Sequence, residues 1–405
     1  MTRYTLVGCA VLAASSVSAK APTRLSFDDV VRLARQQAPV VRLAREDTQV
    51  VRGQRITAAA LASSNPAFET NVGNRWGDAR TTDVELALMV ATELGGKRAS
   101  RIAVADSWAR LAYAQVSDVE RITVVRAARA YFRVLHASQM RDLMARRRDL
   151  ASQLLTTARE RRAAGDAAEI EVNLAAGELS RAASRISVAE RALEKARSRL
   201  ALVLGLESAI WEVSGSLDNR SFLDKEVKEP NERSDVRIAQ ERVALASDEI
   251  SLAKSSRWPD VSFRITYAQE EAAHIVTGGL SITLPLFEHG QGGRAQAYAR
   301  KRRAQIALES VKTALRLELG TALEEYRLAT QAAALLAGHA LPIAEKTERM
   351  AKESYAAGKI DLTAFLVIRR ETLDTQREAL DLQLEAALAA VNLWGARGAP
   401  TKGKQ

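Results

Sequence analysis

Few residues of this sequence have types and spacings that could do chemistry, and none of them forms a complete catalytic motif. Residues 95–98 (GGKR) lack the upstream glycine and the Ser/Thr of a phosphate-binding loop. Ser251 and Lys254 fit an SxxK pattern without its companion motifs. Neither HExxH nor CxxC occurs, and the scattered histidines make no metal site by spacing: His136, His274, His289 and His339. We therefore predict no catalytic residue, no metal site, no cofactor and no enzyme.

The composition predicts long helices instead of a thick globular core. Only 5% of the 405 residues are aromatic, and no proline lies between Pro66 and Pro230. The formal charge of +10 comes from Lys and Arg that alternate with Asp and Glu along the helical stretches. Mixed signs are typical of solvated helix faces. We therefore expect no nucleic acid partner, although a basic helical nucleic-acid binder remains a minor alternative.

The first residues predict export. Residues 1–19 read as a signal peptide, with a short positive start, an apolar run over 6–18 and small residues before a cleavage site after Ala19. A lipoprotein box ending at Cys9 is the less favoured alternative, because only five residues precede it. No later stretch approaches the roughly 18 apolar residues that a transmembrane helix requires.

The chain is predicted to be a tandem duplication. Three ordered markers recur at offsets of 193 (258 − 65), 195 (290 − 95) and 193 (358 − 165) residues. The first repeat covers 20–205 and the second 231–397. A polar, irregular linker is expected over 206–230, and a disordered tail over 398–405.

Each copy has the same predicted order: a helix, a β-hairpin, a very long helix, a tight glycine turn and a return helix. In the first copy the first helix covers about 26–63, the β-hairpin about 67–94 and the long helix about 96–163, and the return helix ends near 204. In the second copy the first helix covers about 231–256, the β-hairpin about 260–287 and the long helix about 293–356, and the return helix ends near 396. Ser26 with Asp28 and Asp29 predicts an N-cap, and Pro342 is expected to kink the second long helix. At 1.5 Å per residue, each long helix reaches roughly 100 Å.

The hairpins carry period-two patterns that predict one apolar and one polar face. Their strands have the length of transmembrane β-strands, and aromatic residues lie towards their ends. A soluble sheet that rests one face on a core is the alternative, but the sequence offers no other core. The predicted lipid-facing residues are Val84, Leu86, Leu88, Val90, Val261, Phe263, Ile265, Tyr267, Leu280, Ile282, Leu284 and Leu286.

Four strands per chain cannot close a barrel, and open strand edges are not tolerated in lipid. Closure must therefore come from oligomerisation. Two chains would give eight strands with a filled interior, whereas three would give twelve and leave space for a lumen. The strand count alone leaves both open.

Several ordered segments resemble the TolC family of outer-membrane efflux proteins, over essentially the whole mature chain. They are 25–31 (LSFDDVV), 284–292 (LPLFEHGQG), 355–362 (YAAGKIDL) and its weaker twin 163–170 (AAGDAAEI). The resemblance implies a mainly α-helical homotrimer with a twelve-stranded barrel in the outer membrane and an α-helical tunnel through the periplasm. The short linker and the GGKR segment look most like the CzcC-type branch, which serves heavy-metal efflux.

The same resemblance implies partners and sites. A periplasmic adaptor and an inner-membrane RND pump would meet the helical turns, and lipid would surround the barrel. The implied docking residues are Gly165, Asp166, Glu169, Val172, Gly358, Asp361, Leu362 and Leu366. Glu171 is a possible lumen acid. Acidic residues that drug-exporting relatives carry are replaced by Ala364 and Val367.

The expected function is that of a passive conduit in a tripartite efflux system, in the outer membrane of a Gram-negative bacterium. Divalent heavy-metal cations are the predicted cargo. A channel for multidrug efflux or type I secretion is one alternative. A periplasmic coiled-coil structural protein is another.

Overall fold

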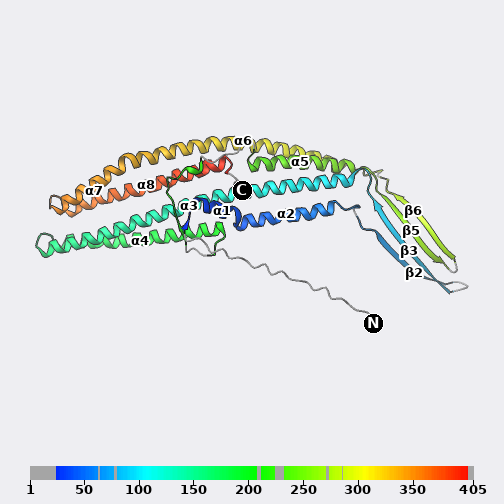
Figure 1. Ribbon diagram of the computed structural model, residues 1–405, viewed down its shortest axis with the longest axis horizontal. Coiled ribbons are helices and arrows are strands. Elements are labelled where there is room, and N and C mark those ends of the chain that lie inside the picture. Colours follow the sequence, from blue (N-terminus) through cyan, green and yellow to red (C-terminus); the bar gives the residue numbers. More distant parts are fainter. Residues whose placement is uncertain are drawn as a thin grey trace.

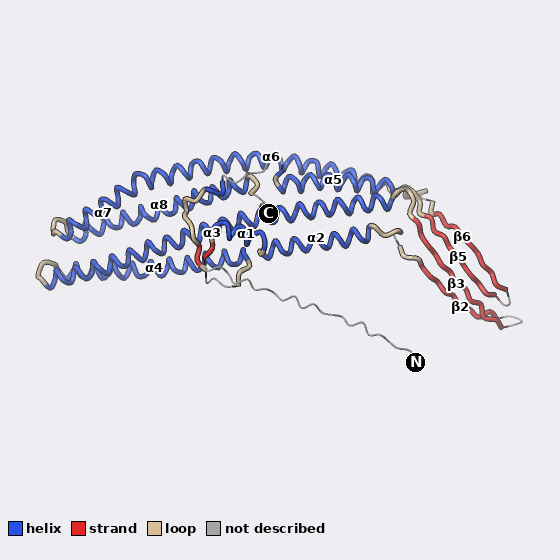
Figure 2. The backbone as a smooth tube through the Cα atoms, in the orientation of Figure 1, coloured by secondary structure: helices blue, strands red, loops and turns tan. Residues whose placement is uncertain are grey.

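The computed structural model of the chain describes residues 24–62, 64–76, 80–207, 211–223, 232–270, 273–284 and 286–399. The molecule is elongated, with four strands at one end, two helical turns at the other, and long helices between them (Figure 1). The strands are segregated beyond the ends of the helices (Figure 2). The predicted signal peptide, 1–19, and Cys9 lie outside the described residues.

Each half of the chain contributes the same series of elements. The first half comprises α1 (Phe27–Gln36), α2 (Pro39–Ala58), β2 (Ala67–Trp76), β3 (Arg80–Thr92), α3 (Lys97–Ala163) and α4 (Glu169–Leu204). The second comprises α5 (Ser234–Ser255), β5 (Val261–Glu270), β6 (Ala273–Ile282), α6 (Gln291–Leu335), α7 (Leu341–Ala356) and α8 (Leu362–Ala396). The long helix α3 packs against α2 and α5 towards the strands, and against α4 and α8 towards the turns. The mainly α-helical fold with two hairpins is as predicted.

Pro39 divides the first predicted helix into two. The sequence indicated one helix over about 26–63, but Ala38 has a ψ of 130° and separates α1 from α2. The residue before a proline avoids helical conformation, because the proline ring clashes with its backbone. The predicted cap at Ser26 is confirmed: its hydroxyl accepts from the Asp29 N–H at 3.2 Å, and the Asp29 carboxylate accepts from the Ser26 N–H.

The second long helix is interrupted as well. A π-helical turn, η3 (Leu336–Ala340), separates α6 from α7, and Pro342 stands at the start of α7. Pro342 has no N–H to donate, and its ring excludes the carbonyl of Gly338 from the usual position. A π-turn is one way in which a helix absorbs such a misfit. The predicted kink at Pro342 therefore takes the form of this turn.

An aromatic core at the middle of the molecule joins distant parts of the sequence. Five rings pack with centroids 4.8–6.0 Å apart: Phe27, Tyr131, Phe132, Phe222 and Trp394. They come from α1, α3, the segment between the repeats, and α8. This core fixes the first helix and the last helix on the long helix α3.

The segment between the repeats, predicted as an irregular linker over 206–230, contributes to this core through its described part. Its strand β4 (Glu212–Val213) pairs in parallel with β1 (Arg24–Leu25), and its 3-10 turn η1 (Ser221–Leu223) follows. Trp211, Leu217 and Phe222 are buried. These three large apolar side chains, which stand in an otherwise polar stretch, pack against α1 and α3.

The predicted disordered tail begins too early. Gly398 and Ala399 are ordered, and Ala399 is buried against the aromatic core. The Gly398 N–H donates to the carbonyl of Gly395 at 3.0 Å, which closes the end of α8. Residues 400–405 lie outside the described part of the chain.

Candidate functional site

The two hairpins form one antiparallel sheet in the order β2-β3-β5-β6. Directly opposed residues share a face, and the register aligns Phe68 with Leu88 and Leu88 with Ile265. Because side chains alternate along each strand, this register gathers most of the large apolar residues of the four strands on one face. These residues are Phe68, Val72, Trp76, Val84, Leu86, Leu88, Val90, Phe263, Ile265, Tyr267, Val276, Leu280 and Ile282.

No described helix packs across this apolar face. The strands contact one another, while the helices lie beyond one end of the sheet (Figure 2). Trp76 is 80% exposed and Val276 is 72% exposed, values that core residues do not have. An uncovered apolar face that extends over four strands is unusual for a soluble monomer.

Three of the predicted lipid-facing positions lie outside the exposed apolar face of the strands. Val261 is buried where the sheet adjoins the helices. Leu284 and Leu286 follow the last strand residue, Ile282, and therefore lie in the connection to α6. Val276 belongs to the apolar face but was missed, because Gly278 and Gly279 interrupt the alternation in β6.

The opposite face of the sheet is polar and carries ion pairs that connect the two hairpins. Arg264 of β5 contacts Glu69 of β2 at 3.1 Å, and Arg75 of β2 contacts Glu270 of β5 at 3.2 Å. Both pairs cross β3, which presents the small Ala87 between Glu69 and Thr266. The described charges of this face are four carboxylates and two guanidinium groups: Glu69, Asp83, Glu85, Glu270, Arg75 and Arg264.

The other end of the molecule holds the two helical turns, which have the same backbone geometry. Gly165 and Gly358 adopt left-handed φ values of 85° and 67°. In each turn the next residue donates its N–H to a carbonyl five positions earlier: Asp166 to Arg161, and Lys359 to Ser354, both at 2.8 Å. This bond is the signature of a Schellman motif, which reverses a chain at a helix end. The duplication is thus preserved at the level of single hydrogen bonds.

The predicted docking residues surround these turns but differ in exposure. Those that are exposed are Gly165, Asp166, Glu169, Gly358 and Asp361. Val172 and Leu366 are partly buried. Leu362 is only 1% exposed, because it packs under Tyr355 and Phe365. Leu362 therefore packs the turn from inside, and its part in docking stays a prediction.

Tyr355 of α7 lies between the two hairpins of helices. Its ring stacks on Phe365 of α8 with centroids 5.5 Å apart, and the guanidinium of Arg161 lies 5.1 Å from the ring centroid. Arg161 also approaches Glu171 of α4 at 3.8 Å. Burial raises the pKa of the Tyr355 phenol. Glu171, the predicted lumen acid, is thus half-buried beside Arg161 and Tyr355.

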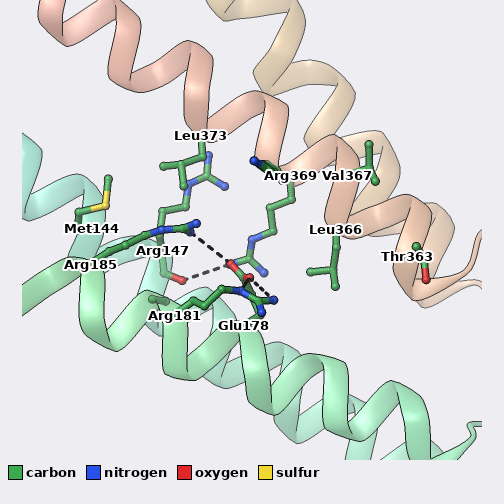
Figure 3. A pocket seen from close by; sticks show the side chains of 12 residues that line it. Met144, Arg147, Glu178, Arg181, Arg185, Thr363, Leu366, Val367, Arg369 and Leu373 are labelled. Atoms are coloured by element: carbon green, nitrogen blue, oxygen red, sulfur yellow. Dashed lines mark hydrogen bonds and ion pairs between the residues drawn. The ribbon is translucent and has the colours of Figure 1, made fainter.

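A cavity of about 470 Å³ lies between the two helical hairpins, α3–α4 and α7–α8, and farther from the helical turns than Tyr355 (Figure 3). Five arginines line it: Arg147, Arg181, Arg185, Arg369 and Arg370. Glu178 accepts from Arg181 at 3.1 Å and lies 3.7 Å from Arg185. The partly buried Leu366 lines the same cavity.

Arg147 connects the two helical hairpins beside this cavity. From α3 it forms a two-pronged ion pair with Glu348 of α7 and donates to Gln376 of α8. Arg369 of α8 in turn donates to the backbone carbonyl of Arg147 at 3.2 Å. Burial lowers the pKa of the Arg369 guanidinium, and the nearby charge of Arg147 adds to the effect. Sequence patterns carry no signal for this network, because its partners lie 201 to 229 residues apart.

The described residues include no group of three or more His, Cys, Asp or Glu that could hold a metal ion. His136 contacts Asp381 at 2.8 Å, and His274 contacts the Tyr267 hydroxyl at 2.7 Å. Among the described helices, none combines the length and the apolar character needed to span a membrane.

Comparisons with known proteins identify relatives in sequence. Residues 228–399 match the family model described as outer membrane efflux protein. The chain is 26% identical over 324 residues to the cobalt-zinc-cadmium resistance protein CzcC of Cupriavidus metallidurans. This match covers 77% of the present chain and 74% of the relative.

Solved structures share the fold. CusC superimposes with a TM-score of 0.76 at 18% sequence identity, over 92% of each chain. The outer membrane protein VceC of Vibrio cholerae superimposes with a TM-score of 0.75 at 18% identity, over 93% of this chain and 97% of VceC. The family domain, the relative in sequence and the shared fold agree with the motifs at 25–31, 284–292 and 355–362. Residues 228–399 thus carry the outer membrane efflux protein domain, and the chain as a whole has the fold of CusC and VceC.

Proposed function

We propose that this chain is the outer-membrane channel subunit of a tripartite efflux system, a passive conduit that exports divalent heavy-metal cations. The observation that carries the proposal is the sheet whose apolar face is uncovered by its own chain. Acyl chains would cover that face, and strands of ten residues have the length to cross them. The proposal gives the chain no catalytic role.

The edges of the sheet support a homotrimer. β2 and β6 each have a free edge, and unpaired backbone groups in hydrocarbon cost several kcal/mol each. Pairing β6 of one chain with β2 of the next satisfies both edges. Three chains then supply twelve strands, which leave room for a lumen, whereas eight strands would be filled by side chains.

The charge of the polar face supports a cationic cargo. In a closed barrel this face lines the lumen, and each chain contributes four carboxylates against two guanidinium groups among its described residues. A lumen with an excess of carboxylates favours cations over anions. The relative CzcC is named for resistance to cobalt, zinc and cadmium, which are divalent cations of this kind.

The helical turns are the proposed contact with a periplasmic adaptor and an inner-membrane pump. Their exposed residues present carboxylates, with Asp166 and Glu169 on the first turn and Asp361 on the second. Glu171 stands behind them beside Arg161. We therefore expect Glu171 to hold the tip together in this state instead of forming a free acidic ring.

A pair of neighbouring substitutions tests the membrane part of the proposal. Ile265 lies at the middle of β5 on the apolar face, and Thr266 lies on the polar face. A lysine at the middle of a lipid-facing strand costs about 2 to 4 kcal/mol. We expect Ile265→Lys to prevent SDS-resistant trimers in the outer-membrane fraction, whereas Thr266→Lys should still give them. Equal recovery of both variants, or a soluble periplasmic oligomer, would contradict the proposal.

A deletion strain tests the cargo. Loss of the gene is expected to increase sensitivity to cobalt, zinc and cadmium, and the wild-type gene should restore growth. The Thr266→Lys variant, which adds a positive charge to the proposed lumen, should restore metal tolerance less well than Thr266→Ser. Unchanged metal tolerance with altered drug tolerance would assign the channel to multidrug efflux instead.

A further inference from the structure

The passage from the strands to the helices holds an open groove. It has a volume of about 1210 Å³ and lies between the start of α3, the end of α5 and the start of α6. Gly95, Trp258, Arg294 and Tyr298 are among its lining residues. Trp258 packs over Gly95 so closely that a Cβ at Gly95 would lie 2.2 Å from its ring. The glycine thus lets the indole form one wall of the groove.

Three cations of this groove have no carboxylate partner among the described residues. Lys254 lies over the Tyr298 ring at 5.9 Å, and Arg257 lies over the Trp258 ring at 5.7 Å. Arg294 donates only to the backbone carbonyl of His289, at 2.8 Å. Cations held by rings and a carbonyl keep hydrogen-bonding capacity for an anion.

Two cations beside the groove, at the same height along the molecule, are paired with carboxylates. Lys97 contacts Asp260 at 2.7 Å, and Arg101 contacts Glu93 at 2.9 Å. Lys97 and Arg101 beside the groove are thus neutralised by carboxylates, whereas Lys254, Arg257 and Arg294 within it are not. An uncompensated cluster in one groove indicates a ligand of negative charge.

The connection from β6 to α6 adds an apolar part. Leu284 is 66% exposed, Leu286 74% and Phe287 93%. These side chains lie between the apolar face of the sheet and the basic groove along the chain. Exposed apolar groups, aromatic rings and cations at one level are the mixture that proteins place at a membrane–water interface.

We propose that this groove binds the phosphate of an anionic phospholipid in the inner leaflet of the outer membrane. The inference rests on the proposed function, because strands that cross the hydrocarbon place these connections at headgroup depth. Lys254, Arg257 and Arg294 bind the phosphate oxygens, and the leucines and Phe287 lie against the upper part of the acyl chains. The lipid fixes the height of the barrel in the membrane.

Native mass spectrometry of the purified trimer tests this proposal with phosphatidylglycerol as the probe. Replacing Lys254, Arg257 and Arg294 together by Gln should lower the affinity for phosphatidylglycerol roughly 100-fold, from the usual contribution of each surface cation. Affinity for the zwitterionic phosphatidylcholine should change little. The control replaces Arg302, Arg303 and Arg316 of α6 by Gln, which removes the same charge from exposed positions outside the groove.

Several outcomes overturn the proposal: an unchanged affinity for phosphatidylglycerol, an equal loss in the control, or displacement of the lipid by millimolar inorganic phosphate. The last result would assign the groove to a free anion. Insertion of the trimers into liposomes reports separately on the barrel. A groove variant that inserts normally yet keeps its lipid contradicts this inference alone, whereas failure of the wild type to insert contradicts the proposed function. Arg257→Gln, a single change of an exposed side chain, repeats the measurement if the triple variant does not fold.

Discussion

The two helical hairpins of the chain have the same turn geometry, but the long helices that lead into the two turns differ. α3 is continuous over 67 residues, whereas its counterpart is split into α6, the π-turn η3 and α7. Counting back from the turn glycines, Pro342 occupies the position of Asp149, since 358 − 342 and 165 − 149 both equal 16. The interruption of the second long helix thus coincides with a proline where the continuous α3 has Asp149.

The turns themselves differ in their anchoring. Asp361 caps α8 by accepting from the Ala364 N–H at 2.7 Å, whereas the equivalent Ala168 offers α4 no side-chain cap. The second hairpin also carries the stacked pair of Tyr355 and Phe365. The glycine conformation alone is therefore enough to reverse the chain, whereas the side-chain cap and the stacked rings determine how stable each turn is. We therefore expect the first turn to loosen more easily than the second.

The largest effect is expected from moving the interruption into the first hairpin. Asp149→Pro removes a backbone donor from the interior of α3 and displaces a carbonyl one turn earlier, at a cost of about 3 kcal/mol or more. Thermal unfolding of the purified trimer, followed by circular dichroism, should show a clear fall in the midpoint. Asp149→Ala is the control, because Asp149 is exposed and pairs only with its neighbour Arg148. Equal midpoints for the two variants would show that α3 tolerates the break that α6 and α7 contain.

The next largest effect concerns the link between the hairpins. Arg147→Ala leaves Glu348 only the more distant Arg369, at 4.0 Å, in a site where that carboxylate is 18% exposed. Loss of one partner of a buried pair is strongly destabilising, and we expect about 2 to 3 kcal/mol here because some solvent reaches Glu348. Arg148→Ala, next in the chain but exposed, should cost under about 0.5 kcal/mol. Similar losses in urea unfolding for both variants would mean that Arg147 does not join the hairpins.

The sequence was sufficient for those parts of the fold that depend on local patterns. Period-two alternation is a local property, so the apolar face of Leu86, Leu88 and Ile265 could be predicted before any register was known. The glycine turns were predictable for the same reason, because Gly165 and Gly358 each follow a helical pattern directly. The exceptions within the sheet are the positions where glycines or strand ends disturb the period, as at Val276 and Leu284.

Contacts between distant segments gave no such signal. Trp211 and Phe222 stand in a polar stretch, and nothing nearby in the sequence shows that α1 and α3 bury them. Likewise, the pairing of Arg147 with Glu348 depends on how two hairpins lie side by side, which periodicity does not determine. Pro39 did carry a local signal, and the helix break it causes was missed because the apolar pattern continues across it.

A smaller effect is expected at Tyr355, where the second hairpin contacts the first. An unfolded tyrosine ionises near pH 10, whereas burial keeps the folded phenol neutral to higher pH. The stability that Tyr355 contributes is therefore complete below about pH 10 and is lost as the pH rises through its raised pKa. Tyr355→Phe should change stability little at neutral pH, because the Tyr355 hydroxyl has no hydrogen-bond partner among the described residues, but it should lose stability less steeply above pH 10 than the wild type. The exposed Tyr113→Phe serves as control, and identical alkaline profiles for wild type and Tyr355→Phe would exclude this role.

The smallest effect concerns the caps, and it tests the comparison in both directions. Asp361→Ala removes the capping oxygen of α8 and should lower the stability by about 1 kcal/mol. Ala168→Asp offers α4 the same kind of cap and should raise the stability by a fraction of that amount. Hydrogen exchange at the two turns is the sensitive measurement, because caps act on the first turn of a helix. We expect faster exchange at 364–366 in Asp361→Ala and slower exchange at 171–173 in Ala168→Asp. If Ala168→Asp leaves the first turn unchanged, the missing cap is not what distinguishes the two turns, and the aromatic pair of Tyr355 and Phe365 must account for the difference.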